Sequence, residues 1–246
     1  MKFLSVLLLL AATPAIAADK IYFTTEDYPP YNFRVGDAVE GAGYAQVLLM
    51  MKDIGIDYEI EMMPWARAIA LAETEHMHCV FTAAHIPERD KLFKWIEPID
   101  VGRNFMVAAR DSGVKVKSVD ESKDFIVGTQ RNDYTQTILE QQGFSKIDLA
   151  TDLKLTLKKL KSGRIDLMPI SEQHYVELVE RGEPVEAQYV FSKQTFAIAC
   201  NKNLPDALHQ KMQAALDRLI ADGTQAEIFE KYALRYTDFG QEKPGN

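Results

Sequence analysis

The sequence predicts an α/β fold of two similar lobes, each a mainly parallel sheet flanked by helices. Short apolar strands alternate with amphipathic helices along most of the chain, a pattern typical of parallel sheets with right-handed crossover connections. A helix that runs into a short buried strand occurs twice, as RAIALAETEHMHCVFT from Arg67 and as LKLTLKKLKSGRIDLMPI from Leu153. With 246 residues, the chain is long enough for two lobes that each have a core.

The first series of elements is marked by residues that begin and end strands and helices. The first strand alternates in polarity, and the turn-like EDYPPYNF follows it. Gly55 ends an apolar helix. A polar loop that carries Arg89 follows the third strand, at the carboxyl end where open α/β sheets bind ligands. The expected elements are strands at 20–25, 58–62 and 79–84, with helices at 43–54 and 65–75.

The second series repeats the alternation. Ser118 and Glu121 have the spacing of a capping box, and Gly143 and Gly163 follow helical segments as end signals. Two helices follow the last strand without a further strand, so the tail must pack on a lobe already made and the chain crosses twice between the lobes. Strands are expected at 105–109, 125–129, 146–149, 165–169 and 196–200, and helices at 134–142, 152–163, 171–181, 205–221 and 224–232.

The first residues, MKFLSVLLLLAATPAIAA, have the pattern of a secretory signal peptide. One lysine precedes an apolar run that is too short to span a bilayer, and Ala15 and Ala17 supply the small residues of a cleavage site. We expect cleavage after Ala17, which makes residues 1–17 the signal peptide and predicts a soluble exported protein; the family resemblance described below places it in the periplasm. No cysteine begins the mature chain, which argues against a lipid anchor.

The net charge of the chain argues against some classes of binding partner. The formal net charge is -8, and nucleic acid or anionic lipid would require a basic face. The charge therefore argues against both as the main partner. We expect a monomer that binds a small-molecule ligand. Two cysteines, Cys79 and Cys200, are exported to an oxidising compartment. The residues alone leave two alternatives open, a disulfide or two separately buried thiols.

Five segments, in order, resemble the bacterial extracellular solute-binding proteins of family 3, the periplasmic polar-amino-acid type. They are DYPPYNF, PWARA, IPERDKLFKWIEPI, SGRID and IADGTQAEIFEKYAL, and PW-x-RA indicates a subgroup. The resemblance implies a type II periplasmic binding fold, in which two crossover strands join the lobes and a ligand is trapped as the lobes close. Lobe 1 would comprise residues 18–102 and 194–246, and lobe 2 residues 103–193.

The resemblance also implies the pairing of two strands and a function. The strand at 196–200 would lie beside the strand at 79–84, which favours the Cys79–Cys200 disulfide. The protein would capture a small amino-acid-like or carboxylate solute and deliver it to an ABC-type permease in the inner membrane. It would not be an enzyme, and no cofactor is expected.

Three site residues follow from the resemblance. Arg89 matches the arginine that holds the ligand carboxylate, which suits a guanidinium because it offers two parallel donors. The alternative is a surface arginine paired with Glu88 or Asp90. Tyr28 and Trp65 match the aromatic walls of the ligand site, although aromatic residues after a strand more often close a core.

Other candidates are weighed against ordinary structural roles. Arg67 lies in the first turn of a helix, where a cation opposes the macrodipole, so it either contacts an anion or pairs with Glu26 or Asp27. The segment GTQRNDY follows a strand and begins a helix, so its main-chain N–H groups could bind an anion, and Arg131 would add positive charge there. The alternative is an ordinary turn in which Asn132 takes the left-handed conformation. The place of the family's ammonium-binding Asp is taken by Ser171, with Glu172 next to it, and Glu172 or Glu26 could substitute.

Two other classes of function remain open at this stage. A dehydratase that acts on cyclic acids shares the fold, and a soluble sensing input for a membrane sensor would bind ligand equally well. His76, His78 and His85 invite a metal site, but no acidic residue completes a convincing set nearby. We therefore expect no metal.

Overall fold

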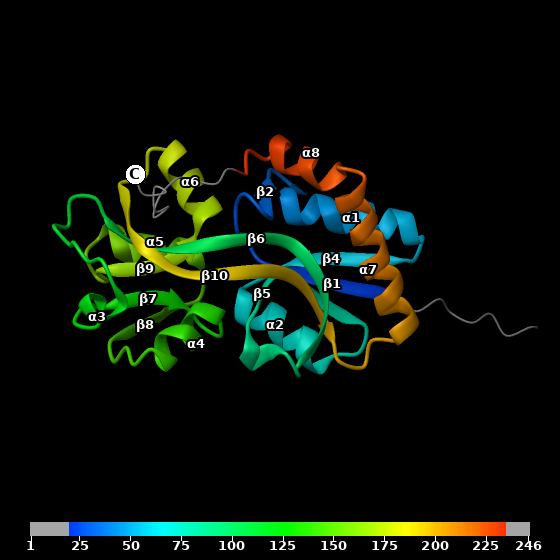
Figure 1. Ribbon diagram of the computed structural model, residues 1–246, viewed down its shortest axis with the longest axis horizontal. Helices are drawn as coiled ribbons and strands as arrows, with labels where there is room; N and C mark the ends of the chain where they lie inside the picture. The colour runs from blue at the N-terminus through cyan, green and yellow to red at the C-terminus, as the bar shows by residue number, and fades with distance from the viewer. Residues whose placement is uncertain (1–19, 235–246) are drawn as a thin grey trace, which may run out of the picture.

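The computed structural model describes residues 20–234, which form two lobes joined by two long strands (Figure 1). The predicted signal peptide, residues 1–17, lies outside the described residues. One eight-stranded sheet runs through both lobes in the order β4-β1-β5-β10-β6-β9-β7-β8. We name the part that contains β4, β1 and β5 lobe 1, and the part that contains β9, β7 and β8 lobe 2.

Lobe 1 is a parallel sheet covered by helices, as the alternating pattern predicts. β1 pairs in parallel with both β4 and β5. Gly55 ends α1 in the left-handed conformation, and its N–H donates to the Met51 carbonyl. The elements are β1 (Ile21–Thr25), β2 (Phe33–Val35), β3 (Ala38–Glu40), α1 (Ala42–Ile54), β4 (Tyr58–Met62), α2 (Trp65–Thr74), β5 (His78–His85), a short 3-10 helix (Pro87–Arg89), α7 (Asp206–Ala221) and α8 (Thr224–Lys231).

Lobe 2 repeats this arrangement with β7 parallel to β8 and β9. Its helices begin at side-chain caps, of which Asp152 and Ser171 accept from N–H groups of the first turn. Ser118 likewise caps Glu121, but the Glu121 carboxylate bonds the Lys117 N–H instead of completing the predicted capping box. The elements are α3 (Val119–Ser122), β7 (Val127–Gln130), α4 (Tyr134–Gln141), β8 (Ile147–Ala150), α5 (Leu153–Lys161), β9 (Leu167–Ser171) and α6 (Glu172–Glu180).

The two connecting strands are much longer than the sequence predicts. β6 (Phe93–Ala109) and β10 (Val185–Asn201) pair antiparallel along their whole length. The apolar pattern marks only one end of each, because charged and glycine residues occupy the part that passes between the lobes. β6 pairs with β9 from Asn104 onward, and β10 pairs with β5 from Thr195 onward. We keep residues 103–193 as the proposed extent of lobe 2.

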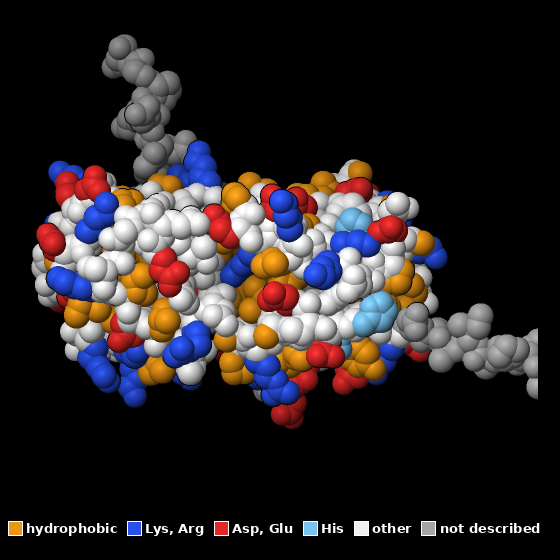
Figure 2. All heavy atoms as spheres, turned by 90° about the horizontal axis from the view of Figure 1, so that it is seen from below, with side chains coloured by type: hydrophobic (Ala, Val, Ile, Leu, Met, Phe, Trp, Pro, Cys, Tyr) orange, Lys and Arg blue, Asp and Glu red, His pale blue; other side chains and the backbone are white. Residues whose placement is uncertain are grey.

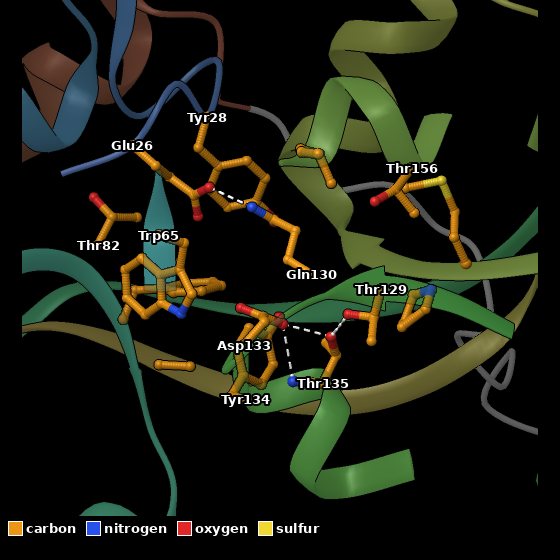
Figure 3. Close-up of a pocket in the computed structure, with 15 residues that line it drawn as sticks. Glu26, Tyr28, Trp65, Thr82, Thr129, Gln130, Asp133, Tyr134, Thr135 and Thr156 are labelled. Atoms are coloured by element: carbon orange, nitrogen blue, oxygen red, sulfur yellow. Dashed lines mark hydrogen bonds between the residues drawn. The ribbon is translucent and has the colours of Figure 1, made fainter. Parts of the chain in front are cut away.

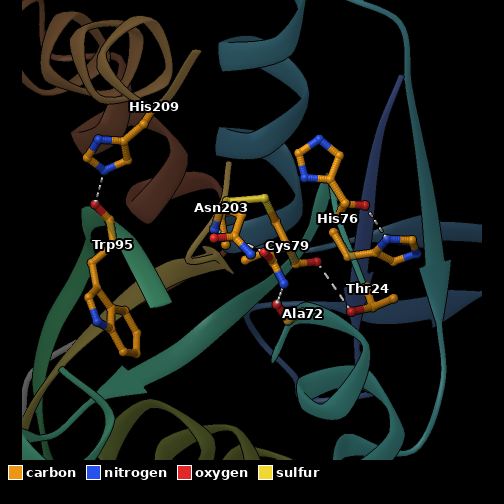
Figure 4. The surroundings of a disulfide bond; sticks show 10 residues. Thr24, Ala72, His76, Cys79, Trp95, Asn203 and His209 are labelled. Carbon is orange, nitrogen blue, oxygen red and sulfur yellow. Dashed lines mark hydrogen bonds between the residues drawn. A yellow bond between two sulfur atoms is a disulfide. The ribbon is translucent and has the colours of Figure 1, made fainter. Parts of the chain in front are cut away.

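Cys79 and Cys200 are joined by a disulfide, as the family resemblance implies (Figure 4). They face each other in the β5–β10 ladder, and both are fully buried. The bond closes a loop with a sequence separation of 121 residues. Loop-closure entropy for a loop of this length corresponds to about 5 kcal/mol. The bond ties the returning chain to lobe 1 and leaves the crossover between the lobes free.

One face of the molecule is of mixed charge. On the face drawn in Figure 2, acidic and basic side chains are interspersed over both lobes. Within residues 20–234, no helix combines the length and the apolar character that a membrane crossing requires.

We expect the exported protein, unfolded without reductant, to react with no thiol reagent. Reduction should lower the free energy of unfolding by up to about 5 kcal/mol, as measured by denaturant titration. A Cys79→Ser/Cys200→Ser variant is the control, because reductant should not change its stability. Two reactive thiols in the unreduced protein would exclude the disulfide.

Candidate functional site

A small cavity lies where the two lobes meet, lined by side chains of both (Figure 3). Its volume is about 20 Å³, which is room for one water molecule. The lining combines aromatic rings, hydroxyl groups and two carboxyl groups. The lining residues are Glu26, Tyr28, Trp65, Thr82, Ala84, Thr129, Gln130, Asp133, Tyr134, Thr135, Leu153, Thr156, Met168, Pro169 and Phe196.

Glu26 enters the cavity from lobe 1, directly after β1 ends at Thr25. Its side chain is 8% exposed, and one carboxyl oxygen accepts a 2.5 Å hydrogen bond from Gln130 of lobe 2. Burial, with a smaller contribution from Asp133, raises the pKa of Glu26 to about 8. The carboxyl group is therefore mostly protonated at neutral pH.

Asp133 enters the cavity from lobe 2 as the N-cap of α4. Its carboxylate accepts hydrogen bonds from the Thr135 N–H at 2.9 Å and from the Thr135 hydroxyl. Burial raises the pKa of Asp133, while the bonds from Thr135 and the charge of Arg89 act in the opposite direction. Asp133 therefore both caps α4 and lines the cavity.

Two aromatic side chains of lobe 1 bond directly to lobe 2. The Trp65 indole N–H donates to the Asn132 carbonyl at 3.0 Å, and the Tyr28 hydroxyl accepts from the Ser171 N–H at 3.1 Å. Both rings line the cavity, where the resemblance expects the aromatic walls. Asn132 has a φ of 59°, the left-handed conformation that the sequence predicts.

Arg89 lies beside the cavity rather than in its lining. Its side chain is 6% exposed, and it donates to the main-chain carbonyls of Asn132 at 2.9 Å and Ala84 at 3.3 Å. The guanidinium also lies over the Trp65 ring, 5.8 Å from its centroid. Within residues 20–234 it forms no ion pair, so the alternative of a surface arginine paired with Glu88 or Asp90 is wrong.

Thr82 is held in a strained conformation at the cavity. It lies within β5 at a φ of 60°, which is rare for a β-branched residue and typical of functional sites. Its hydroxyl donates to Asn32 at 2.7 Å. A Cβ at Gly43 would lie 2.6 Å from the Thr82 hydroxyl oxygen, so the start of α1 must carry glycine for this hydroxyl to fit.

The other sequence-predicted candidates lie away from the cavity. Arg67 and Arg131 are exposed, and neither lines it; Arg67 pairs with neither Glu26 nor Asp27 in the described part of the chain. Ser171 caps α6. Glu172 is buried and accepts two hydrogen bonds from Arg103, at 3.0 and 2.6 Å, so this carboxylate is held by the crossover strand.

The histidines have ordinary partners. His78 stacks on Tyr22 with ring centroids 4.9 Å apart. His85 stacks on Trp95 at 4.1 Å and bonds Glu97 and Asp90. No group of three or more metal-ligating side chains is found among the described residues.

Sequence reasoning missed Gln130, Asp133 and the Asn132 carbonyl. All lie in GTQRNDY, which it marked only for Arg131 and its main-chain N–H groups. An N-cap signal at Asp133 could have been found, since Asp before a helix is a preferred cap. The cross-lobe bonds could not, because they join residues 43 or more positions apart.

Comparison with known proteins identifies relatives of the whole fold. A family model described as bacterial extracellular solute-binding proteins, family 3, matches residues 21–235. Three solved structures are similar over 87–89% of this chain and 95–97% of theirs. They are a histidine kinase sensor domain with similarity to periplasmic binding proteins (16% identity, TM-score 0.79), an ancestral arginine-binding protein bound to arginine (22%, 0.76) and the arginine-, lysine-, histidine-binding protein ArtJ of Geobacillus stearothermophilus (18%, 0.79).

We expect Glu26→Gln to stabilise the protein at high pH. Folding raises the pKa of this carboxyl group from near 4.5 to near 8. The free energy of unfolding of the wild type therefore falls as the pH rises from the first value to the second. The variant should melt close to the wild type at pH 5 and several degrees higher at pH 9, by differential scanning calorimetry. Equal differences at both pH values would show that Glu26 does not titrate in this range.

Proposed function

Because the chain belongs to family 3 of the bacterial extracellular solute-binding proteins, we propose that it captures a small amino-acid-like or carboxylate solute between its lobes. It then delivers the solute to an ABC-type permease in the inner membrane. The observation that carries the proposal is the cavity between the lobes, which side chains of both line. A solute held there contacts both halves, so its binding energy favours closure.

Direct bonds between the lobes support a closing mechanism. Pro29 of lobe 1 accepts a 2.7 Å hydrogen bond from His174 of lobe 2, in addition to the bonds at Glu26, Tyr28, Trp65 and Arg89. Burial lowers the pKa of His174 to about 4, so the ring is neutral at neutral pH and its Nδ1 carries the donated proton. A typical net contribution of 0.5–1.5 kcal/mol for each bond is small enough for closure to be reversible.

The chemistry beside the cavity fits an amino-acid-like solute. Tyr28 and Trp65 supply apolar walls. Arg89 is a buried cation that donates to the main-chain carbonyls of Ala84 and Asn132, and a ligand carboxylate would be a stronger acceptor. Two of the similar structures bind arginine or the basic amino acids by their descriptions.

A sensing role is the second candidate. The similarity to a histidine kinase sensor domain over 87% of this chain favours it, because that domain is a sensor with the same fold. Both roles require the same ligand site and an exported protein, which the signal-peptide pattern predicts. Capture of a permease or of a membrane sensor by the loaded protein would separate them.

Native mass spectrometry of freshly purified protein tests the proposal. We expect a mass excess that corresponds to a small solute and that disappears after unfolding, dialysis and refolding with the disulfide intact. Adding the identified solute should restore both the mass excess and a higher melting temperature. A protein that carries no solute and gains stability from no amino acid or carboxylate would contradict the proposed function.

We expect Arg89→Ala to weaken binding of the identified solute at least tenfold. Truncation removes a buried, charged hydrogen-bonding group, and such losses cost roughly 2 to 5 kcal/mol. Arg67→Ala is the matched control, because Arg67 is an exposed arginine of the same lobe. The affinity of this variant for the solute should stay near that of the wild type. Calorimetric titration measures both. Unchanged affinity in a folded Arg89→Ala protein would remove Arg89 from the site.

A further inference from the structure

We propose that His85 is a positioning residue for Arg89, and that it holds the loop of Arg89 when its ring is protonated. The inference rests on the proposed function only where it treats Arg89 as the anchor of the solute. His85 is the last residue of β5, and Arg89 ends the short 3-10 helix that follows it. We name residues 86–92, which contain this helix, the Arg89 loop.

Two neighbouring side-chain contacts join the Arg89 loop to the end of β5. The Arg89 guanidinium donates to the main-chain carbonyl of Ala84 at 3.3 Å. One residue further along, a carboxyl oxygen of Asp90 lies 2.6 Å from Nε2 of His85. The contact of His85 therefore fixes the residue directly after Arg89, and it supports the place that the guanidinium takes beside the cavity.

A second carboxyl group meets the other nitrogen of the same ring. His85 Nδ1 lies 2.8 Å from an oxygen of Glu97 on β6. A neutral imidazole has one N–H donor, whereas the protonated ring has two. An ionised carboxylate only accepts hydrogen bonds, so the protonated ring is the form that satisfies both contacts at once. In this form His85 links the Arg89 loop to a strand that passes between the lobes.

Trp95 covers one face of the His85 ring. The two rings stack with centroids 4.1 Å apart and planes 11° from parallel, and the face of an indole ring attracts a cation. Ion pairs that are open to water contribute little, and the Asp90 side chain is 59% exposed. The His85 side chain is only 23% exposed, so the stack limits the screening of its charge by water.

Within residues 20–234, His85 forms ion pairs with these two carboxylates and with no other group. Its neighbour on β10 is Thr195, which is uncharged. From α7, the ring of His209 approaches the same region, but its Nε2 bonds the main-chain carbonyl of Trp95 at 2.8 Å (Figure 4). The ion pairs of His85 therefore favour its protonated form.

The Arg89 loop also carries two contacts with lobe 2. Glu88 accepts a 2.6 Å hydrogen bond from Gln141, and Arg89 donates to the Asn132 carbonyl at 2.9 Å. Histidine is the side chain that changes its charge near neutral pH. When the ring of His85 loses its proton, one nitrogen turns a lone pair toward a carboxylate, and that contact is lost. We therefore expect the loop and its contacts with lobe 2 to loosen together.

Hydrogen exchange in the solute-free protein tests the inference without a solute. The main-chain N–H groups of Arg89, Asp90 and Leu92 donate within the loop. Their exchange rates, divided by those of an unfolded chain at the same pH, report how firmly the loop is held. In the same samples, NMR signals of the ring nitrogens of His85, recorded from pH 5 to pH 9, show at which pH the ring loses its proton.

Three variants separate the charge of His85 from its other roles. His85→Gln removes the charge, and His85→Arg keeps a planar charged group that can stack on Trp95 at every pH. His78→Gln is the matched control, because His78 also stacks on an aromatic ring, that of Tyr22, but forms no ion pair within the described part of the chain. Melting temperatures confirm that each variant folds. If His85→Arg does not fold, the comparison of the wild type with His85→Gln decides the test.

We expect the ring to carry two N–H protons at pH 6. Relative exchange in the loop should rise at least about tenfold as one proton is lost, since a hydrogen bond to a charged group disappears. His78→Gln should behave as the wild type, His85→Gln should exchange fast at every pH, and His85→Arg should exchange slowly at every pH. A neutral ring at pH 6 would overturn the inference, as would loop exchange that does not follow the charge of the ring. A rise with pH that persists in His85→Gln would also overturn it, because another group such as Glu26 would then be the cause.

Calorimetric titration with L-arginine and L-glutamate separates this inference from the proposed function. A probe whose carboxylate Arg89 holds should bind the wild type at least about tenfold less tightly once the ring is neutral, and His85→Arg should keep its affinity. An unchanged affinity beside a loosened loop would support the role of His85 and exclude Arg89 as the anchor. If neither probe binds, loop exchange alone decides the inference, and the solute found by native mass spectrometry decides the proposed function.

Discussion

The pairing of β6 with β10 is the constraint on which the rest of the structure depends. Each strand passes through both lobes, and the two strands pair with each other from one lobe to the other. The two strands therefore hold the lobes together, and the proposed closure would take place by rotation where they pass between the lobes. Register shifts at 190–192 and 196–198 in β10 interrupt the ladder on either side of this passage. Such irregularities bend and twist a strand locally, which suits a hinge.

Closure across this hinge depends on few groups. The Asn132 carbonyl accepts from both Trp65 and Arg89, and its direction is set by the left-handed conformation of Asn132. Asp133, the next residue, begins α4 and lines the cavity. One turn of lobe 2 thus supplies a contact that holds the lobes together and a charge that faces the ligand space. Changes to this turn will affect closure and ligand preference together.

Much of the fold could be predicted from local patterns. Most helices and short strands end within one or two residues of the expected positions, because glycine ends such as Gly55 and caps such as Asp152 are local signals. The long crossover strands could not be predicted in full, since their middle parts have no apolar alternation and are stabilised by pairing with each other. The disulfide followed only from the family resemblance, which set β5 beside β10.

The site was less predictable than the fold. Tyr28, Trp65 and Glu26 lie at the cavity as the sequence proposes, because they follow strand ends or begin a helix there. Glu172 and Arg131 do not, since their surroundings depend on residues distant in the chain. The partner of Glu172, Arg103, lies in the middle of a crossover strand, where the sequence carries no motif. Which carboxylate faces the ligand is thus decided by tertiary pairing, which one sequence does not reveal.

The central claim is that a solute is held between two lobes that close on it. Small-angle X-ray scattering before and after the solute is removed by unfolding and refolding, with the disulfide intact, tests it most directly. The account predicts a larger radius of gyration for the solute-free protein, and a smaller value when the solute is added back. An identical scattering curve in both conditions would contradict it.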